Sequence, residues 1–377
     1  MPSFVRALGQ WKRDAQTIAR SFTRERPPPF MVRVGRAPLA QKARVLVVDA
    51  ILRETKDAVT IVLRDPTNGP IDYLPGQFFT VSVRLGERVV RRNYSASRPA
   101  SGSQLAITVK RVSSGTVSPY LVDQLKVGDE LSVEGPSGHF VVRPNPSAAR
   151  ELLLIGGGSG ITPLMAIGTS VLSAEPRSSV TLIYGNRSEE AVIFREAIRA
   201  LEEAYPERFV GRYALERPPP GWGGYSGILN GAALSQLISE KISVTDVYVC
   251  GPGPMRQEAK RFLESRGIDP HCIHEERYTL SEHVASEGAA AGIELSVGGR
   301  RFEITTRPNE TLLEAGLRAK APMPYSCAMG GCGACRLKLE AGDVVMEEPN
   351  CLTPGEKREG YVLTCVGRAT SNCVLHE

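Results

Sequence analysis

The chain has 377 residues, 42% hydrophobic and 23% charged, which is a globular composition and a length for two or three domains. Its net charge of +5 is concentrated in residues 1–40, which carry a local charge of +6, whereas the remaining residues carry −1. The body of the chain therefore has no basic surface for nucleic acid, and a nucleic-acid-binding function is excluded for it.

Residues 1–41 are predicted to be a basic amino-terminal extension. Its apolar residues are scattered among basic ones, and Pro27–Pro29 interrupts any helix. A poorly ordered tail is favoured over an amphipathic surface helix. Contact between this segment and an anionic membrane surface is an alternative that we do not favour. The segment lacks the continuous apolar core of a secretory signal.

Residues 42–147 predict a small antiparallel β-barrel. Short β-rich runs recur here, separated by Gly, Pro, Asp and Ser. These runs are Arg44–Leu52, Ala58–Leu63, Phe78–Val83, Ala106–Arg111 and Glu130–Glu134.

The barrel segment contains Arg92-Asn93-Tyr94-Ser95 after a predicted strand. A flavin needs a cation near its phosphates, a flat partner for its ring and a hydrogen-bonding group facing N5. Arg92, Tyr94 and Ser95 can supply these in turn, because strand alternation points Arg92 and Tyr94 to one face. The alternative is a barrel strand with an exposed arginine.

A second motif, Gly115-Thr116-Val117-Ser118, follows a later strand. Ser118 and the proline after it predict a helix that is capped by the serine and has proline in its first turn. Free N–H groups at such a helix start suit an anionic phosphate.

Residues 148–280 predict an α/β domain with a mainly parallel sheet, because apolar strand runs alternate with helical patterns. The expected strands are Leu152–Ile155, Val180–Tyr184 and Asp246–Cys250, and the expected helices are Pro163–Leu172, Glu189–Ala204 and Pro254–Arg266.

The first strand of this domain runs into a glycine-rich turn. Gly156, Gly158 and Gly160 precede Thr162, so the backbone can approach a pyrophosphate at the start of the next helix. The 23 residues 152–174 carry no charge and have the length of a membrane span, but their glycines and proline favour a turn between two buried elements.

Two further strand ends contribute to the predicted nicotinamide site. Arg187 follows the second strand, where NAD enzymes usually place an acid for the ribose hydroxyls. The arginine permits NADPH without requiring it, and we expect NADH, because Glu189 and Glu190 flank it. Cys250-Gly251-Pro252 ends a later strand at the same edge of the sheet.

Residues 281–292 predict a linker, and residues 293–377 predict a third domain. Cys327, Cys332 and Cys335 have the spacing C-x4-C-x2-C, and Cys365 follows 29 residues after the third. Three thiolates from one loop and a fourth from further on suit a [2Fe-2S] cluster. Structural zinc is the alternative, although zinc sites usually show paired C-x2-C units. Such thiolates favour a reducing compartment, so we expect a cytoplasmic protein.

These motifs, in this order, resemble the ferredoxin–NADP reductase superfamily over residues 43–280 and plant-type ferredoxins over residues 293–377. The resemblance implies a β-grasp fold for the third domain and favours FAD over FMN. It also implies site residues. By resemblance, Arg92, Tyr94 and Ser95 bind the flavin, Gly115, Thr116, Val117 and Ser118 bind its phosphates, Val109 and Lys110 lie beside its diphosphate, and Cys250 and Glu276 lie near the nicotinamide and the flavin. A buried structural role for Cys250 is the alternative.

The domain order resembles that of reductase components of oxygenases, such as those of phenylacetyl-CoA epoxidase and ketosteroid hydroxylase. It implies an enzyme that passes electrons from NADH or NADPH through FAD to its own [2Fe-2S] cluster. A terminal oxygenase, hydroxylase or desaturase is the expected electron acceptor. The alternative function is a self-sufficient reductase of a small molecule such as a quinone, a ferric chelate or nitric oxide.

Overall fold

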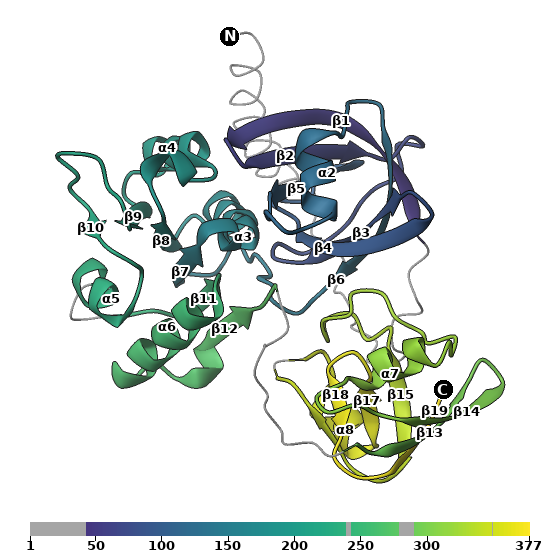
Figure 1. Cartoon of the computed structure of the whole chain (residues 1–377). Helices are drawn as coiled ribbons and strands as arrows, with labels where there is room; N and C mark the ends of the chain where they lie inside the picture. The colour runs from purple at the N-terminus through teal and green to yellow at the C-terminus, as the bar shows by residue number, and fades with distance from the viewer. Residues whose placement is uncertain (1–42, 239–242, 279–289, 349) are drawn as a thin grey trace.

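The computed structural model describes residues 43–238, 243–278, 290–348 and 350–377, which build three successive β-sheet domains (Figure 1). The predicted extension 1–41 lies outside the described residues, as does most of the predicted linker 281–292. Their interpretations therefore stay predictions. The first strand of the third domain begins at Gly292, the last residue of the predicted linker.

The first domain is an antiparallel sheet whose strands run in the order β4-β3-β6-β1-β2-β5. A bridge between Ala96 and Ile107 joins its two edges, so the sheet closes into the predicted barrel around an apolar interior. Its strands are β1 (Arg44–Thr55), β2 (Ala58–Arg64), β3 (Phe78–Leu85), β4 (Arg88–Ser95), β5 (Gln104–Lys110) and β6 (Glu130–Ser137). The barrel prediction is confirmed.

Arg92–Ser95 follows β3, as predicted, and forms the second half of β4. One local prediction in this domain is wrong. The helix α2 (Val117–Asp123) begins one residue before Ser118, and Thr116 takes the cap position. The Ser118 hydroxyl instead accepts a hydrogen bond from the Val112 N–H at 3.0 Å, so it closes the preceding loop rather than capping the helix.

The second domain is a parallel sheet in the order β10-β9-β8-β7-β11-β12. Leu152 and Leu154 of β7 pack on one face, and Leu153 and Ile155 pack on the other, so helices cover both faces. The strands are β7 (Glu151–Gly157), β8 (Ser179–Asn186), β9 (Phe209–Leu215), β10 (Tyr225–Ser226), β11 (Asp246–Cys250) and β12 (Ile273–Glu276). The α-helices are α3 (Ile161–Ala174), α4 (Arg195–Ala204), α5 (Gly231–Leu237) and α6 (Gly253–Ser265).

The predicted helix Glu189–Ala204 is interrupted. A single 3-10 turn, η2 (Glu189–Ala191), comes first, and α4 begins only at Arg195. Between them Phe194 is left-handed with φ of 63° and is almost fully buried. Burial of this ring fixes a backbone conformation that a continuous helix does not allow.

The third domain is a five-stranded sheet in the order β14-β13-β19-β15-β17 crossed by α7 (Leu312–Arg318), as the predicted β-grasp fold requires. The side chains of Thr311 and Glu314 form a reciprocal cap that fixes the start of α7. The strands of this sheet are β13 (Gly292–Val297), β14 (Arg300–Thr305), β15 (Arg336–Ala341), β17 (Tyr361–Leu363) and β19 (Cys373–His376). A separate two-stranded sheet is formed by β16 (Val344–Met346) and β18 (Gly367–Ala369), and the second helix of the domain is α8 (Pro354–Arg358).

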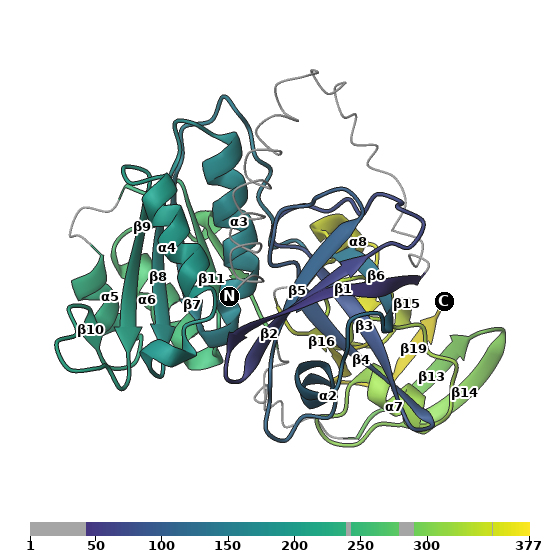
Figure 2. The same ribbon diagram turned by 90° about the horizontal axis from the view of Figure 1, so that it is seen from above.

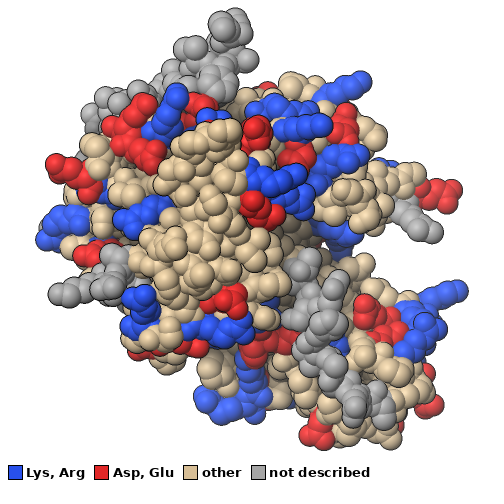
Figure 3. Space-filling model, turned by 60° about the vertical axis from the view of Figure 1, so that its left-hand side comes forward, with Lys and Arg blue, Asp and Glu red and all other residues tan. Residues whose placement is uncertain are grey.

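The barrel lies between the other two domains, with the ferredoxin-like domain and the α/β domain on different sides of it (Figures 1 and 2). In the space-filling view, positive and negative side chains intermingle around a broad uncharged area (Figure 3). No helix among the described residues is long and apolar enough to cross a membrane.

Candidate functional site

Strand β4 presents the predicted flavin residues. Arg92 is exposed, Tyr94 is half-buried at the rim of the barrel core, and Ser95 is 3% exposed. The helix α2 packs against β4 and β5, which brings the Gly115–Ser118 segment beside this strand. Val109 of β5 lies in the barrel core. An exposed cation, a ring and a hydroxyl on one strand fit the chemical demands of a flavin.

The predicted glycine turn joins β7 to α3 through η1 (Gly158–Gly160). A Cβ on Gly160 would lie 2.1 Å from the Cys250 carbonyl oxygen, and one on Gly157 would lie 2.8 Å from Pro252. Gly251 has a φ of 155° and faces Gly157 at similarly close range. The ends of β7 and β11 therefore meet backbone to backbone, which only glycine allows.

Lys110 connects the barrel to this turn. A Cβ placed on Gly158, whose φ is 53°, would lie 3.9 Å from the Lys110 Nζ. The ammonium group is also 3.9 Å from Asp57 on the barrel. A lysine beside a glycine turn gives a diphosphate one cation and a row of N–H groups.

Residues from both domains converge where the barrel meets the carboxyl ends of β11 and β12. The Ser95 hydroxyl donates to Glu276 Oε2 at 3.1 Å, and the Cys250 Sγ lies 4.0 Å from the same oxygen. The Tyr278 hydroxyl lies 3.3 Å from Ser95 and 2.7 Å from the Thr162 hydroxyl. Four predicted residues are thus brought together, and Tyr278 is a member that sequence reasoning missed.

Burial sets the ionisation of this group. Desolvation raises the pKa of Glu276 to about 8, although the hydrogen bond from Ser95 opposes the shift. Burial, and then the neighbouring Glu276, raise the pKa of the Cys250 thiol well above its ordinary value. Both shifts favour the protonated, uncharged forms of these two side chains.

Arg187 is exposed and follows β8 directly. The Arg217 N–H donates to the Arg187 carbonyl at 2.8 Å, so a second arginine follows the neighbouring strand at the same edge. Sequence reasoning missed Arg217, because β9 was not among the predicted strands. A hydrogen bond from Ser188 is the main cause that lowers the pKa of Glu190. The positive charges of Arg195 and Arg217 lower it further.

The four predicted cluster ligands lie together and fall into two pairs. Cys335 Sγ and Cys365 Sγ are 3.1 Å apart, and the Cys327 N–H donates to Cys332 Sγ at 3.4 Å. Two thiols for each of two irons is the ligand set of a [2Fe-2S] cluster. Among the described residues, no group of three or more His, Cys, Asp or Glu is placed to hold a single metal ion.

Backbone N–H groups surround these sulfurs. Gly330 N–H donates to Cys365 Sγ at 3.2 Å, and Met329 N–H donates to Cys327 Sγ at 3.4 Å. Gly330 needs its positive φ of 73° to turn this N–H inward. Such donors stabilise the negative charge of cluster sulfurs, so the loop fits the cluster.

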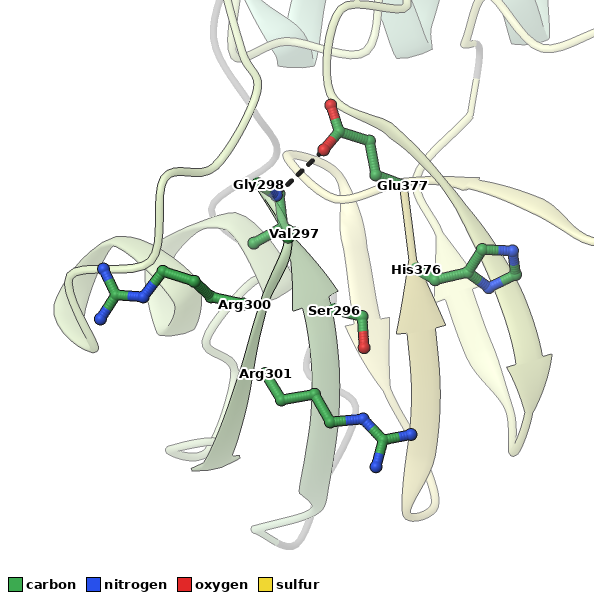
Figure 4. Close-up of a pocket in the computed structure, with 8 residues that line it drawn as sticks. Ser296, Val297, Gly298, Arg300, Arg301, His376 and Glu377 are labelled. Atoms are coloured by element: carbon green, nitrogen blue, oxygen red, sulfur yellow. Dashed lines mark hydrogen bonds between the residues drawn. The ribbon is translucent and has the colours of Figure 1, made fainter.

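A cavity of about 300 Å³ lies elsewhere, at the β13–β14 turn and the carboxyl terminus (Figure 4). Arg300, Arg301, His376 and Glu377 are among its lining residues, and Glu377 accepts a hydrogen bond from the Gly298 N–H. None of the predicted site residues lines it.

Three family models match successive parts of the chain. The oxidoreductase FAD-binding domain matches residues 46–142, the oxidoreductase NAD-binding domain residues 154–261, and the 2Fe-2S iron-sulfur cluster binding domain residues 295–370. The chain is also 32% identical to a component of 1,2-phenylacetyl-CoA epoxidase from Escherichia coli (strain K12) over 332 residues, which cover 85% of this chain and 93% of that protein. The chain belongs to the oxygenase-type reductases of the ferredoxin–NADP reductase superfamily.

A second relative supports the same membership. The reductase is 34% identical to the ferredoxin reductase component of 3-ketosteroid-9-alpha-monooxygenase from Mycobacterium tuberculosis (strain CDC 1551 / Oshkosh) over 90% of this chain and 97% of that one. In fold it matches phthalate dioxygenase reductase, with a TM-score of 0.56, 22% identity, and coverage of 89% of this chain and 98% of that chain. It is an NAD(P)H-dependent oxidoreductase with FAD and a [2Fe-2S] cluster, and its relatives are components of oxygenase systems.

Proposed function

We propose that this reductase takes electrons from NADH and delivers them, through FAD and its own [2Fe-2S] cluster, to a separate terminal oxygenase, hydroxylase or desaturase. When bound, the flavin converts a two-electron hydride into single electrons that a [2Fe-2S] cluster can carry. One observation supports the proposal above others: the loop that carries three cluster ligands is hydrogen-bonded to β4, the strand that carries the flavin motif.

In this proposal the residues of β4 and α2 bind the flavin. Arg92 pairs with its phosphate, Tyr94 covers the ring, and Ser95 faces the reactive edge. The Gly115–Ser118 segment, with Thr116 and Val117 between, supplies backbone N–H groups to the phosphates, and Lys110 adds a positive charge. The exposed Arg92 guanidinium and the packing of α2 against β4 support this division of roles.

The nicotinamide is proposed to enter where Ser95, Cys250 and Glu276 meet. Gly158 leaves room for the pyrophosphate beside Thr162, Gly156 and Gly160 let the turn pack closely on Leu164 and Cys250, and Gly251-Pro252 forms the opposite wall. The raised pKa of Glu276 favours its uncharged form, and Oε2 accepts a hydrogen bond from the Ser95 hydroxyl, which holds that hydroxyl in one orientation. Burial of Ser95, Cys250 and Glu276 would keep water away from the transfer of hydride.

Acceptor specificity is tested with the purified reductase. NADH oxidation is measured with a candidate oxygenase from the same organism, and with quinones, ferric chelates and nitric oxide as the alternative acceptors. Coupled product formation by the oxygenase at a kcat/KM above those for the small acceptors is expected. Faster turnover with a small acceptor, without coupling to any oxygenase, would establish the alternative function.

The flavin assignment is tested with Arg92→Ala. Loss of a charge-assisted contact to phosphate should weaken flavin binding by about 1.5–3 kcal/mol. The measurement is flavin retained through gel filtration at low added flavin. Arg84→Ala, which removes an exposed arginine from β3 of the same sheet, should retain flavin fully. Full retention in Arg92→Ala as well contradicts the assignment.

A further inference from the structure

The outer face of strands β4, β3 and β6 contacts the cluster-binding loop directly. Asn93 Nδ2 donates to the backbone carbonyl of Cys327, a cluster ligand, at 2.8 Å. Arg91 Nη1 donates to the Tyr325 carbonyl at 3.1 Å, and its guanidinium lies 5.5 Å from the centre of the Tyr325 ring. Two of three consecutive loop residues are therefore bound through their backbone by side chains from β4.

The third loop residue, between these two, is bound by its side chain. The Ser326 hydroxyl donates to Glu134 Oε2 at 2.8 Å, and Glu134 also lies 3.7 Å from the Arg91 guanidinium. Thr80 pairs with Asn93 and with Glu134 in the sheet register, and its hydroxyl donates to Asn93 Oδ1 at 2.8 Å. That bond fixes the amide so that its nitrogen faces the loop.

Gly331 completes the contact, because its backbone lies close to the ring of Phe78. A Cβ on Gly331, within the cluster-binding loop, would lie 2.9 Å from the ring of Phe78 on β3. Phe78 is 5% exposed, so its ring cannot move aside freely. Glycine at this position lets the loop lie flat on the sheet.

Successive side chains of β4 point to opposite faces of the strand, and the two faces have different functions. Arg91 and Asn93 point to the face that holds the cluster loop, and Arg92 and Tyr94, one residue on in each case, point to the other face. Asn93, the second residue of the Arg92–Ser95 motif, thus binds the cluster loop and not the flavin side. A rigid strand that holds two partners by opposite faces keeps the separation between them constant.

We propose that Arg91, Asn93 and Glu134 form a cluster clasp, a set of positioning residues that holds the loop of Cys327 against the flavin-binding strand during electron transfer within the chain. This inference rests on the proposed function and adds residues that touch neither substrate nor cofactor. Because the clasp binds only the loop, its loss leaves hydride transfer to the flavin intact and weakens the next step alone.

The test uses the full-length holoprotein with three separate variants, Arg91→Ala, Asn93→Ala and Ser326→Ala, and Arg84→Ala as the matched control. Ser326→Ala breaks the clasp from the ferredoxin side, so a barrel-folding defect cannot explain its result. The first measurement is amide hydrogen exchange of peptides spanning residues 325–333. Each lost hydrogen bond should speed exchange there by about fivefold, because the loop opens more often. Arg84→Ala should leave it unchanged.

The second measurement is anaerobic single-turnover mixing with NADH. The flavin should be reduced at the wild-type rate in every variant, and reduction of the cluster should slow in the double variant Asn93→Ala/Ser326→Ala. Wild-type exchange together with a wild-type rate of cluster reduction in that double variant overturns the clasp. If the wild-type protein itself does not pass electrons from NADH to its cluster, the proposed function fails instead, so the two failures are distinguishable.

Discussion

The Ser95 hydroxyl hydrogen-bonds to Glu276 Oε2 at 3.1 Å, although 181 residues separate them in the chain. This bond joins the last residue of β4 in the barrel to the last residue of β12 in the nucleotide domain. Both side chains are buried, at 3% and 9% exposure, so the two domains share one dry junction. The carboxyl group in it has an ionisation state that can be measured.

Glu276 should make the stability of the reductase fall with rising pH. The pKa of Glu276 is about 8 in the folded chain against an ordinary value of 4.5, so between these values only the folded state keeps the proton. Stability is then full below about pH 5 and is lost progressively toward pH 8. In Glu276→Gln this decline between pH 5 and pH 8 should shrink by about 3–4 kcal/mol, measured by urea unfolding. An identical pH slope in both proteins would contradict the raised pKa of Glu276.

Gly160→Ala should destabilise the nucleotide domain by about 2–3 kcal/mol, because the new methyl group would overlap the Cys250 carbonyl. Binding of NADH should weaken as well, because β7 and β11 are forced apart at their carboxyl ends. Urea unfolding and NADH titration measure the two effects. Gly223→Ala is the matched control, since a Cβ there meets nothing within 4 Å. Equal stability of the two variants would show that the close approach is wrong.

Cys332→Ser should remove the cluster and leave the flavin bound. One of four thiolates is lost, whereas the flavin site lies in a different domain. Iron content and reduction of cytochrome c should collapse, and reduction of ferricyanide, which can draw on the flavin, should persist. Cys272→Ser, which replaces a half-buried cysteine in the nucleotide domain, should change neither activity. Joint loss of both activities in Cys332→Ser would contradict separate domains.

Arg187→Leu tests the expectation that NADH is the donor. If it is, kcat/KM for NADH and NADPH should fall equally and by about twofold, through lost packing alone. Arg217, which follows the neighbouring strand, is already near the negative charge of Glu190, which supports this expectation. A wild-type preference for NADPH that Arg187→Leu abolishes, with a loss of about thirtyfold, would make NADPH the donor.

Local pattern was enough for the motifs and for the larger elements of the first two domains. The alternating and apolar runs predicted five barrel strands and the glycine turn after β7, and cysteine spacing predicted the four thiols that lie together. No range was predicted for β4, β9, β10, β12 or α5, nor for the individual elements of the third domain, and Arg217 was missed. The predicted helix 189–204 is too long, because the apolar spacing continues through Phe194. The left-handed backbone of Phe194 depends on burial of its ring in the tertiary structure, which the spacing does not show.

The contacts that could not be predicted join residues that are far apart in the sequence. Asn93 and Cys327 are 234 residues apart, and no periodicity within either segment indicates that they meet. Tyr278 follows the last strand without a motif of its own, and its role emerges only because Ser95 and Thr162 come from other elements. Contacts between domains are set by the shapes of whole surfaces, which local propensity does not encode.

The clasp has a consequence for building chimeric reductases. Arg91 and Asn93 bind carbonyl groups, which every amino acid possesses, so most of the identity of the ferredoxin loop is irrelevant to its acceptance by the sheet. The loop must still supply a hydroxyl group that donates to Glu134, as Ser326 does, and a glycine opposite Phe78, as at Gly331. A foreign ferredoxin module grafted after the nucleotide domain therefore needs a serine before its first cluster cysteine and a glycine four residues after that cysteine. Cluster potential could then be exchanged between modules without redesigning the flavin domain.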